Sequence, residues 1–142
     1  MKVRPKFTVN RFRTDARGTE RVLGKLESAV IELLWREPGL TVREVQFKLK
    51  RHRDFALTTV LTTLDRLHRK GYLSRVTEGK AFVYSPRYSR PEFDRLVLRE
   101  VLSALMDEFK GAALSEFVDL VADDEEALER LLALGMRRAR RP

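Results

Sequence analysis

The stretch ALTTVLTTLDRLHRKG (Ala56–Gly71) has the apolar spacing of a helix but carries four threonines. Threonine is β-branched and a poor helix former, so a helix selected only for stability would use Ala, Glu, Lys or Gln instead. At about 100° per residue, one face of the helix is apolar and is expected to enter the core: Val60, Leu61, Leu64 and Leu67. The opposite face is polar and is expected to be exposed: Thr59, Thr62, Thr63, Arg66 and Lys70.

Two shorter helices are predicted before this stretch, and a hairpin is predicted after it. The first helix begins near Gly24 and ends at Glu37-Pro38-Gly39, and the second begins at a Thr41–Glu44 capping box. The hairpin consists of two β-branched and aromatic segments, residues 72–76 and 81–85. Helix, helix, helix and two-stranded hairpin is the order of a winged helix-turn-helix, so the predicted fold class is mainly α.

Apolar residues recur at helical spacing from Glu92 onward, which predicts a helix of roughly 18 residues that Gly111 ends, followed by two shorter helices. Three helices in this short region cannot bury so much apolar surface within one chain, so we predict a three-helix dimerisation domain and a homodimer. The residues expected at the dimer interface are Leu98, Val101, Leu102, Leu105, Met106, Phe109, Phe117, Val121, Leu128 and Leu131.

Charge is unevenly distributed along this chain of net charge +8, because its basic residues concentrate before residue 91 and the region that follows is acidic. This favours a polyanion-binding module followed by a module with another role. We divide the chain into a basic N-terminal arm (1–22), a winged-helix domain (23–90), a helical dimerisation domain (91–137) and a basic tail (138–142). The arm is predicted to be flexible; the alternative is an arm that follows phosphates or enters a minor groove.

The polar face of the third helix is interpreted as a DNA-reading surface. Threonine is short enough for close approach, its hydroxyl bonds base edges or phosphates, and its methyl packs against thymine. The candidate DNA-binding residues are Thr58, Thr59, Thr62, Thr63, Arg66 and Lys70, with Arg43 in the second helix and Arg75 and Lys80 in the hairpin. The alternatives are threonines that bond carbonyls of the preceding turn, an Arg66 that pairs within the protein, and solvated charges at the other positions.

The composition gives little support to an enzyme, a metalloprotein or a membrane protein. There is no cysteine and there are only two histidines, which argues against disulfides, metal sites and enzymatic catalysis, and no cofactor is expected. No membrane span or signal peptide is recognisable, so the expected location is the cytoplasm. The rival interpretations are a sequence-blind nucleic-acid packaging protein and a winged helix that docks other proteins.

Four segments carry a resemblance to a known family: LGKLESAVIELLW (23–35), TVREV (41–45), TTVLTTLDRLHRKGYL (58–73) and EGKAFVYSP (78–86). Over roughly residues 23–135, the chain resembles the bacterial penicillinase-repressor family, called BlaI/MecI. The resemblance implies a homodimeric transcriptional repressor that binds palindromic operators in double-stranded DNA. It also implies a membrane sensor protease as a partner.

Three departures from the family pattern bear on these expectations. The cysteines of the copper-responsive branch are absent, which disfavours copper sensing by that route. Asp119-Leu120 stands where the β-lactam branch has its cleaved Asn-Phe bond. The basic arm is longer than is usual, and Ala56 replaces a helix-capping serine, which leaves Asp54 as a substitute cap.

Overall fold

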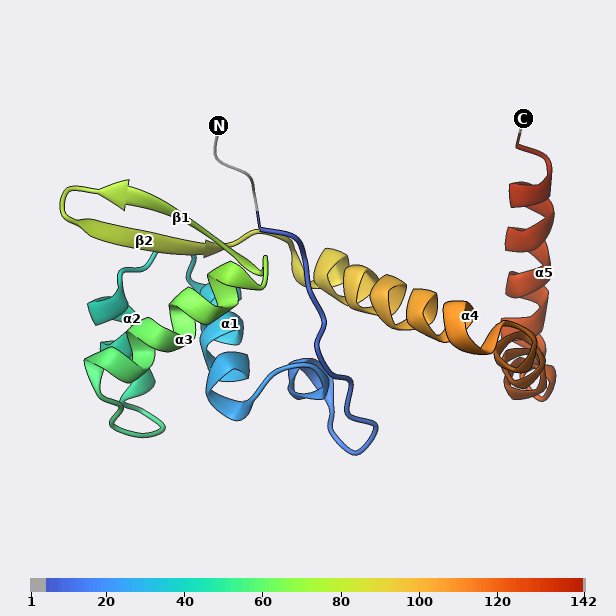
Figure 1. Cartoon of the computed structure of the whole chain (residues 1–142), viewed down its shortest axis with the longest axis horizontal. Coiled ribbons are helices and arrows are strands. Elements are labelled where there is room, and N and C mark those ends of the chain that lie inside the picture. Colours follow the sequence, from blue (N-terminus) through green and yellow to red (C-terminus); the bar gives the residue numbers. More distant parts are fainter. Residues whose placement is uncertain (1–4, 142) are drawn as a thin grey trace. The chain divides into compact units, whose positions relative to one another are not determined.

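The computed structural model describes residues 5–141, which form two compact units, one ending at Val101 and one beginning at Leu102. The elements follow the order η1, α1, α2, α3, β1, β2, α4 and α5 (Figure 1). Each unit is treated separately below. The first contains three short helices and the hairpin, and therefore has the winged-helix topology predicted for this part of the chain.

Helices α1 and α2 of the first unit begin at the predicted signals. Helix α1 (Lys25–Arg36) begins after Gly24, whose N–H donates to the Glu27 carboxylate at 3.2 Å. Helix α2 (Val42–Leu49) begins with the predicted capping box, in which the Glu44 N–H donates to the Thr41 hydroxyl at 3.2 Å and the Thr41 N–H donates to the Glu44 carboxylate at 3.1 Å. Helix α3 (Leu57–Arg69) ends before Gly71, and the backbone φ of Gly71 is +84°.

The hairpin is tied to the helices through its second strand. Strand β1 (Leu73–Glu78) pairs antiparallel with β2 (Ala81–Pro86), and Gly79 takes φ +62° in the turn between them. The Tyr84 N–H donates to the Leu40 carbonyl at 2.8 Å, and the Leu40 N–H donates back at 3.1 Å. The strand therefore extends its pairing to the connection between α1 and α2.

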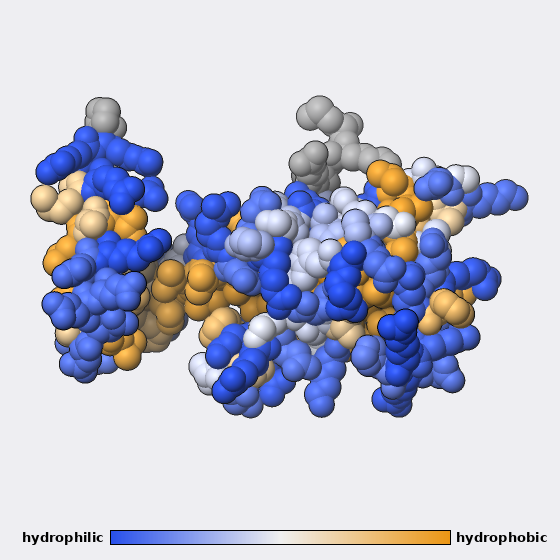
Figure 2. Space-filling model, turned by 180° about the vertical axis from the view of Figure 1, so that it is seen from behind, coloured by the Kyte–Doolittle hydropathy of each residue, from blue (hydrophilic) through white to orange (hydrophobic). Residues whose placement is uncertain are grey.

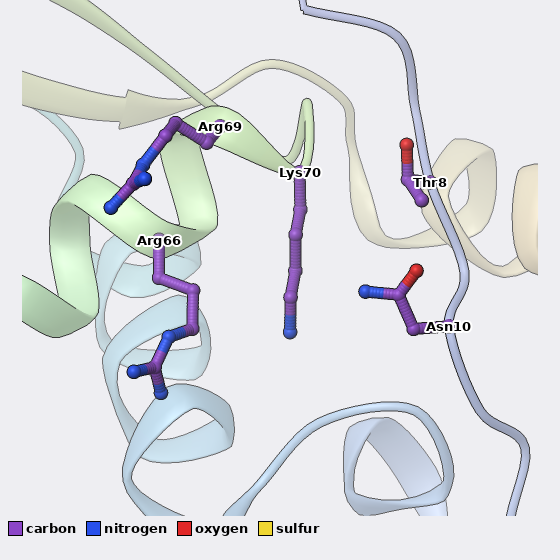
Figure 3. Close-up of a pocket in the computed structure, with 5 residues that line it drawn as sticks. All are labelled: Thr8, Asn10, Arg66, Arg69 and Lys70. Atoms are coloured by element: carbon purple, nitrogen blue, oxygen red, sulfur yellow. The ribbon is translucent and has the colours of Figure 1, made fainter.

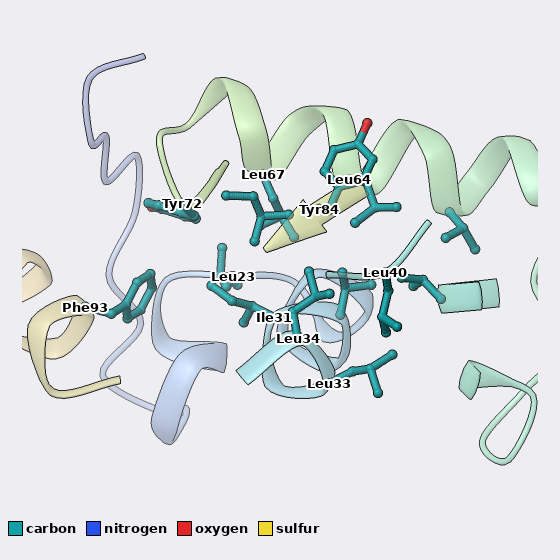
Figure 4. Close-up of a cluster of buried hydrophobic side chains, with 14 of the residues drawn as sticks. Leu23, Ile31, Leu33, Leu34, Leu40, Leu64, Leu67, Tyr72, Tyr84 and Phe93 are labelled. Atoms are coloured by element: carbon teal, nitrogen blue, oxygen red, sulfur yellow. The ribbon is translucent and has the colours of Figure 1, made fainter. Parts of the chain in front are cut away.

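The core of the first unit lies between α1, α3 and the hairpin (Figure 4). Its fully buried aliphatic members include Ile31, Leu34, Leu64 and Leu67. Tyr72, Tyr84 and Phe93 contribute the largest buried side chains. Because these residues come from α1, α3, the hairpin region and α4, their burial holds α3 at a defined position beneath its exposed face.

The segment before α1 is ordered against this core, so the prediction of a flexible arm is wrong for residues 5–22. Phe7 is only 8% exposed, and its ring centroid lies 4.8 Å from that of Tyr72 and 5.5 Å from that of Phe93. The segment runs past the C-terminal end of α3 and then forms η1 (Gly18–Arg21) (Figure 1). Periodicity could not reveal this, because an extended segment held by single anchors has no repeating apolar pattern.

Helix α4 (Arg90–Ala122) begins with a capping box that the sequence analysis did not recognise. The Glu92 N–H donates to the Ser89 hydroxyl and the Ser89 N–H donates to the Glu92 carboxylate, both at 3.3 Å. Pro91 is compatible with this first turn because the N–H groups there have no helical partner. Phe93 and Val97 are buried with the winged helix, so the first unit continues beyond the predicted boundary at residue 90.

The second unit contains the remainder of α4 and helix α5 (Glu125–Ala139), which Asp124 caps by accepting from the Ala127 N–H at 3.0 Å. The backbone of Phe109 is not helical (φ −123°, ψ 31°), so α4 consists of two helical segments. With α5 they give three helices, as predicted, but the break lies at Phe109 and Gly111 continues the second segment. None of the described helices is long and apolar enough to cross a membrane.

Apolar side chains of the second unit remain on its surface, where Figure 2 shows them in orange. No residue of α5 is buried, and the buried residues of α4 all precede Leu102. The largest exposed apolar side chains include Leu102, Leu105, Phe109, Leu114, Phe117, Val118, Leu120 and Leu132. The described part of this unit therefore has no enclosed core of its own.

Candidate nucleic-acid interface

The exposed face of α3 differs from the predicted one at two positions. Thr63 is 6% exposed and lies in the core, whereas Leu61 is 45% exposed. The reason is angular: Thr63 lies about 60° from Val60 around the helix axis, whereas Leu61 lies about 100° away on the other side. Thr63 can be buried because its hydroxyl donates to the Thr59 carbonyl at 2.8 Å. The prediction that Thr63 belongs to the exposed face is therefore wrong.

The outer face of α3 carries Thr58, Thr59, Thr62 and Arg66, all of which are exposed. The Thr62 hydroxyl donates to the Thr58 carbonyl at 2.8 Å, so the back-bonding alternative holds for Thr62 in the absence of a ligand. A hydroxyl that donates in this way keeps its lone pairs, and it can rotate when another acceptor approaches. The face is therefore polar and open along about two helical turns.

The N-terminal end of α3 carries no acidic residue in its first turn and no side-chain cap. The prediction that Asp54 replaces the missing cap is wrong, because the N-cap residue is Ala56 and a capping side chain must stand at that position to reach the next N–H groups. The uncapped N–H groups and the helix dipole favour an anion at this end.

The cations near α3 differ in how they are engaged. Asp65 binds two arginines, Arg69 at 2.7 Å and Arg75 at 3.1 Å. The Arg75 guanidinium also lies 4.3 Å from the centre of the Phe82 ring, which fixes it against the hairpin. Lys70 pairs with the largely buried Glu27 at 3.0 Å. Within residues 5–141, the Arg66 side chain takes part in no ion pair or hydrogen bond, so its guanidinium is available to a ligand.

The other two candidate cations are exposed and lie away from α3 in the sequence. Arg43 is in the first turn of α2, and Lys80 is in the turn of the hairpin. Neither takes part in an ion pair within the described residues. Both are exposed enough to contact a phosphate. A charge that contacts only solvent is equally exposed, so exposure does not distinguish the two interpretations.

Two grooves border α3, and both include Arg66. One, of about 450 Å³, lies between the N-terminal segment and the C-terminal half of α3 (Figure 3) and is lined by Thr8, Asn10, Arg66, Arg69 and Lys70. The other, of about 490 Å³, lies between the start of α1 and α3 and is lined by Gly24, Lys25, Leu26, Glu27, Thr58, Thr59, Thr62, Thr63 and Arg66. Thr8, Asn10 and Lys25 were not among the predicted site residues, because the only signal for them in the sequence is the basic character of the surrounding residues.

Burial shifts the pKa of two titratable side chains near this surface. Desolvation lowers the pKa of His68, and the neighbouring Arg75 adds to that effect. Burial raises the pKa of Tyr72 to about 12, so its hydroxyl stays protonated and donates to the Thr8 carbonyl. His68 thus lies at the boundary between the core and the surface. Among residues 5–141, no three potential ligands are grouped in a way that could hold a metal ion.

The predicted dimer residues lie on the surface of α4 and α5. Five of them are exposed: Leu98, Leu102, Leu105, Phe109 and Phe117. The other five are partly buried: Val101, Met106, Val121, Leu128 and Leu131. Asp119 and Leu120 are exposed within the second helical segment of α4.

Comparisons with known proteins agree with the resemblance. The family model described as penicillinase repressor matches residues 23–134. The transcriptional regulator BlaI of Mycobacterium tuberculosis is 40% identical over 78% of this chain and 83% of its own length. The penicillinase repressor of Bacillus licheniformis is 24% identical over 74% of this chain and 80% of its own. A solution structure of the DNA binding domain of the repressor BlaI matches 47% of this chain and 82% of its own length, with 30% identity and a TM-score of 0.44. On the extent of the family match and the identity to BlaI, this chain belongs to the penicillinase repressor family.

Proposed function

We propose that this protein is a homodimeric transcriptional repressor that binds palindromic operators in double-stranded DNA and blocks access to promoters. The observation that carries the proposal is the outer face of α3, where exposed threonines stand beside an unpaired Arg66 on a winged-helix scaffold. The relatives are named as a transcriptional regulator and a penicillinase repressor, which supports a regulatory role over an enzymatic one.

The chemistry of this face suits a major groove. Threonine hydroxyls donate and accept, and their methyl groups contact thymine, while the arginine fork matches the two acceptors of guanine. Two carboxylates lie beside this face, and both are paired with cations. Asp65 pairs with Arg69 and Arg75, and Glu27, which lines the groove beside the threonines, pairs with Lys70. They therefore offer little repulsion to phosphates. A protein-docking surface would instead centre on aromatic or aliphatic anchors.

The dimer is inferred from the second unit, whose apolar side chains have no enclosed core in one chain. Exposed apolar surface of this extent is typical of an obligate interface, and a second copy covers it by two-fold symmetry. A symmetric dimer carries two α3 helices and therefore recognises a palindrome whose half-sites are separated by about one helical turn or a multiple of it.

The first test is selection of bound duplexes from a random DNA pool at about 150 mM salt, followed by sequencing. We expect an enriched palindrome. Tight binding without any enriched sequence would contradict the repressor and favour a packaging protein. Absence of binding would remove DNA as the ligand.

The same selection with Arg66→Ala tests the assigned face. If Arg66 reads a base, affinity for the enriched duplex falls by about 1–3 kcal/mol and the preference at one position of each half-site relaxes. Arg36→Ala is a control on an exposed cation at the C-terminal end of α1. Equal affinities for the two variants would exclude Arg66 from the interface.

A further inference from the structure

We propose that the N-terminal segment forms part of the DNA-binding surface, and that the groove between residues 8–10 and the C-terminal half of α3 holds a phosphate of the DNA backbone. The inference rests on the DNA-binding function proposed above and extends it beyond α3 and the hairpin. It assigns a role to residues that precede the region matched by the family model, which begins at residue 23.

The lining of this groove has the chemistry of a phosphate site. Thr8 and Asn10 form one wall, and Arg66, Arg69 and Lys70 form the other, without a carboxylate among the lining residues (Figure 3). Asp65 and Glu27 engage Arg69 and Lys70 from outside the groove. Arg66 therefore supplies the uncompensated positive charge, and the Asn10 amide supplies further N–H donors.

The segment that forms the first wall is held in place without DNA. The Thr8 N–H donates to the Lys70 carbonyl at 2.9 Å, and Arg87 donates to the Pro5 carbonyl at 2.6 Å. Phe7 fixes the segment to the core through its aromatic contacts with Tyr72 and Phe93. An ordered wall avoids most of the entropy cost that a disordered arm would meet on binding.

The close approach of the segment also accounts for a glycine at the end of α3. A Cβ atom at Gly71 would lie 2.8 Å from the Lys6 carbonyl oxygen and 2.8 Å from the Phe7 nitrogen. Only glycine allows the backbone of the segment to reach α3 at this point, and Gly71 also has a positive φ of 84°. The N-terminal segment and the end of α3 are therefore fitted to each other.

A second cation extends the same surface. A guanidinium nitrogen of Arg11 lies 3.7 Å from the position that a Cβ of Gly24 would take, at the edge of the groove lined by Lys25 and the α3 threonines. Glu27 also lines this groove, where Lys70 pairs with its carboxylate. Because Arg66 lines both grooves, the cations form one band alongside the outer face of α3. A helix lying in the major groove is bordered by phosphates, so DNA fits this band better than an isolated small anion does.

The test measures affinity for a fluorescein-labelled, random-sequence duplex of roughly 30 base pairs, about three helical turns, as a function of salt. Asn10→Asp places a carboxylate in the groove without changing side-chain size. Thr14→Asp is the charge-matched control, because Thr14 is an exposed residue of the same segment that does not line either groove. Arg11→Gln is tested against Arg17→Gln in the same way.

We expect Asn10→Asp and Arg11→Gln each to lower the affinity for the duplex by about five- to tenfold. Each should also reduce the magnitude of the slope of log affinity against log salt concentration by about 1 for each N-terminal segment that contacts the DNA. The two control variants should stay within about twofold of the unaltered protein, because both positions are exposed to solvent and line neither groove, so salt screens a charge there. Equal effects of Asn10→Asp and Thr14→Asp would overturn the proposal. If the unaltered protein did not bind the duplex, the proposed DNA-binding function itself would be refuted. If the unaltered protein bound and Asn10→Asp and Arg11→Gln bound equally well, only the contact between the N-terminal segment and DNA would be refuted.

Discussion

Thr62 and Thr63 are adjacent threonines with opposite environments. Both hydroxyls donate to a carbonyl one turn earlier at 2.8 Å, but Thr62 is exposed and Thr63 is in the core. Valine has almost the same shape as threonine and lacks the hydroxyl. The two positions therefore separate a role in DNA contact from a role in packing.

We expect Thr62→Val to weaken binding to the selected duplex by about 1 kcal/mol, which is typical of one lost hydrogen bond. Thr63→Val should leave that affinity unchanged and alter the free energy of unfolding by less than about 1 kcal/mol, because the Thr59 carbonyl already accepts within the helix. Anisotropy titration and urea unfolding provide the two measurements. A larger loss of affinity in Thr63→Val than in Thr62→Val would contradict the assigned faces.

His68 makes stability depend on pH. Burial lowers its pKa in the folded protein, with a smaller contribution from Arg75, while Asp65 opposes the shift. The unfolded chain therefore binds a proton more readily than the folded one. The contribution of His68 to the free energy of unfolding is fully present above the ordinary histidine pKa of about 6.5. It is lost as the pH falls from there through the lower pKa of the folded state.

The expected result is that the free energy of unfolding falls between pH 7.5 and pH 5.5, about one unit on either side of that ordinary pKa, and that His68→Gln reduces this dependence. His52→Gln, at the exposed second histidine, should leave the dependence as it is. Urea unfolding at the two pH values measures the free energy of unfolding of both variants. Identical pH profiles for the two variants would exclude His68 as the origin.

At the scale of elements, the N-terminal segment and α3 depend on each other through Gly71. Gly79 offers a matched comparison, since it also has a positive φ, of 62°, but a Cβ there would meet no atom within 4 Å. Substitution by alanine therefore imposes a backbone penalty at both positions, of about 1–2 kcal/mol. Only at Gly71 does it also push the N-terminal segment away.

We predict that Gly71→Ala lowers the free energy of unfolding by more than Gly79→Ala does, and that it exposes the segment to cleavage by trypsin after Arg11 and Arg13. Thermal unfolding and limited trypsin digestion monitored by mass spectrometry measure the two effects. Equal stability and equal digestion patterns for the two variants would show that the segment is not held against α3.

On the scale of the whole molecule, the proposed dimer predicts that the second unit is stabilised by a second copy of the chain. Leu102 is 50% exposed in one chain and lies in the predicted interface. An aspartate at the centre of an apolar interface is left desolvated and unpaired, at a cost of several kcal/mol. Val76 is 64% exposed in the hairpin and is the control for introducing the same charge elsewhere.

Leu102→Asp should therefore be monomeric in sedimentation equilibrium while its first unit retains cooperative unfolding. Val76→Asp should remain a dimer. Since both half-sites contribute to affinity, the monomer should also bind the palindrome far more weakly than the dimer does. A dimer that persists in Leu102→Asp would place the interface elsewhere.

Much of the first unit could be predicted because its signals are local. The Thr41–Glu44 capping box, the end of the first helix at Glu37-Pro38-Gly39 and the β-branched and aromatic segments of the hairpin depend on residues that are neighbours in the sequence. The Asp65–Arg69 pair follows in the same way from a spacing of four residues. The Ser89–Glu92 box is equally local, but it contains Pro91, a residue that also marks the boundary of a segment, so its sequence pattern is ambiguous.

By itself, the sequence determined the helix order, the hairpin and the polar character of α3, because backbone propensities, caps and periodicity act over a few residues. Only the tertiary structure decided that Thr63 is buried and Leu61 exposed, because burial depends on where neighbouring elements pack and not on the helix alone. It also decided that residues 5–22 are ordered and that Asn10 faces Arg66 across a groove. Such contacts join residues far apart in the chain, and no local pattern records them.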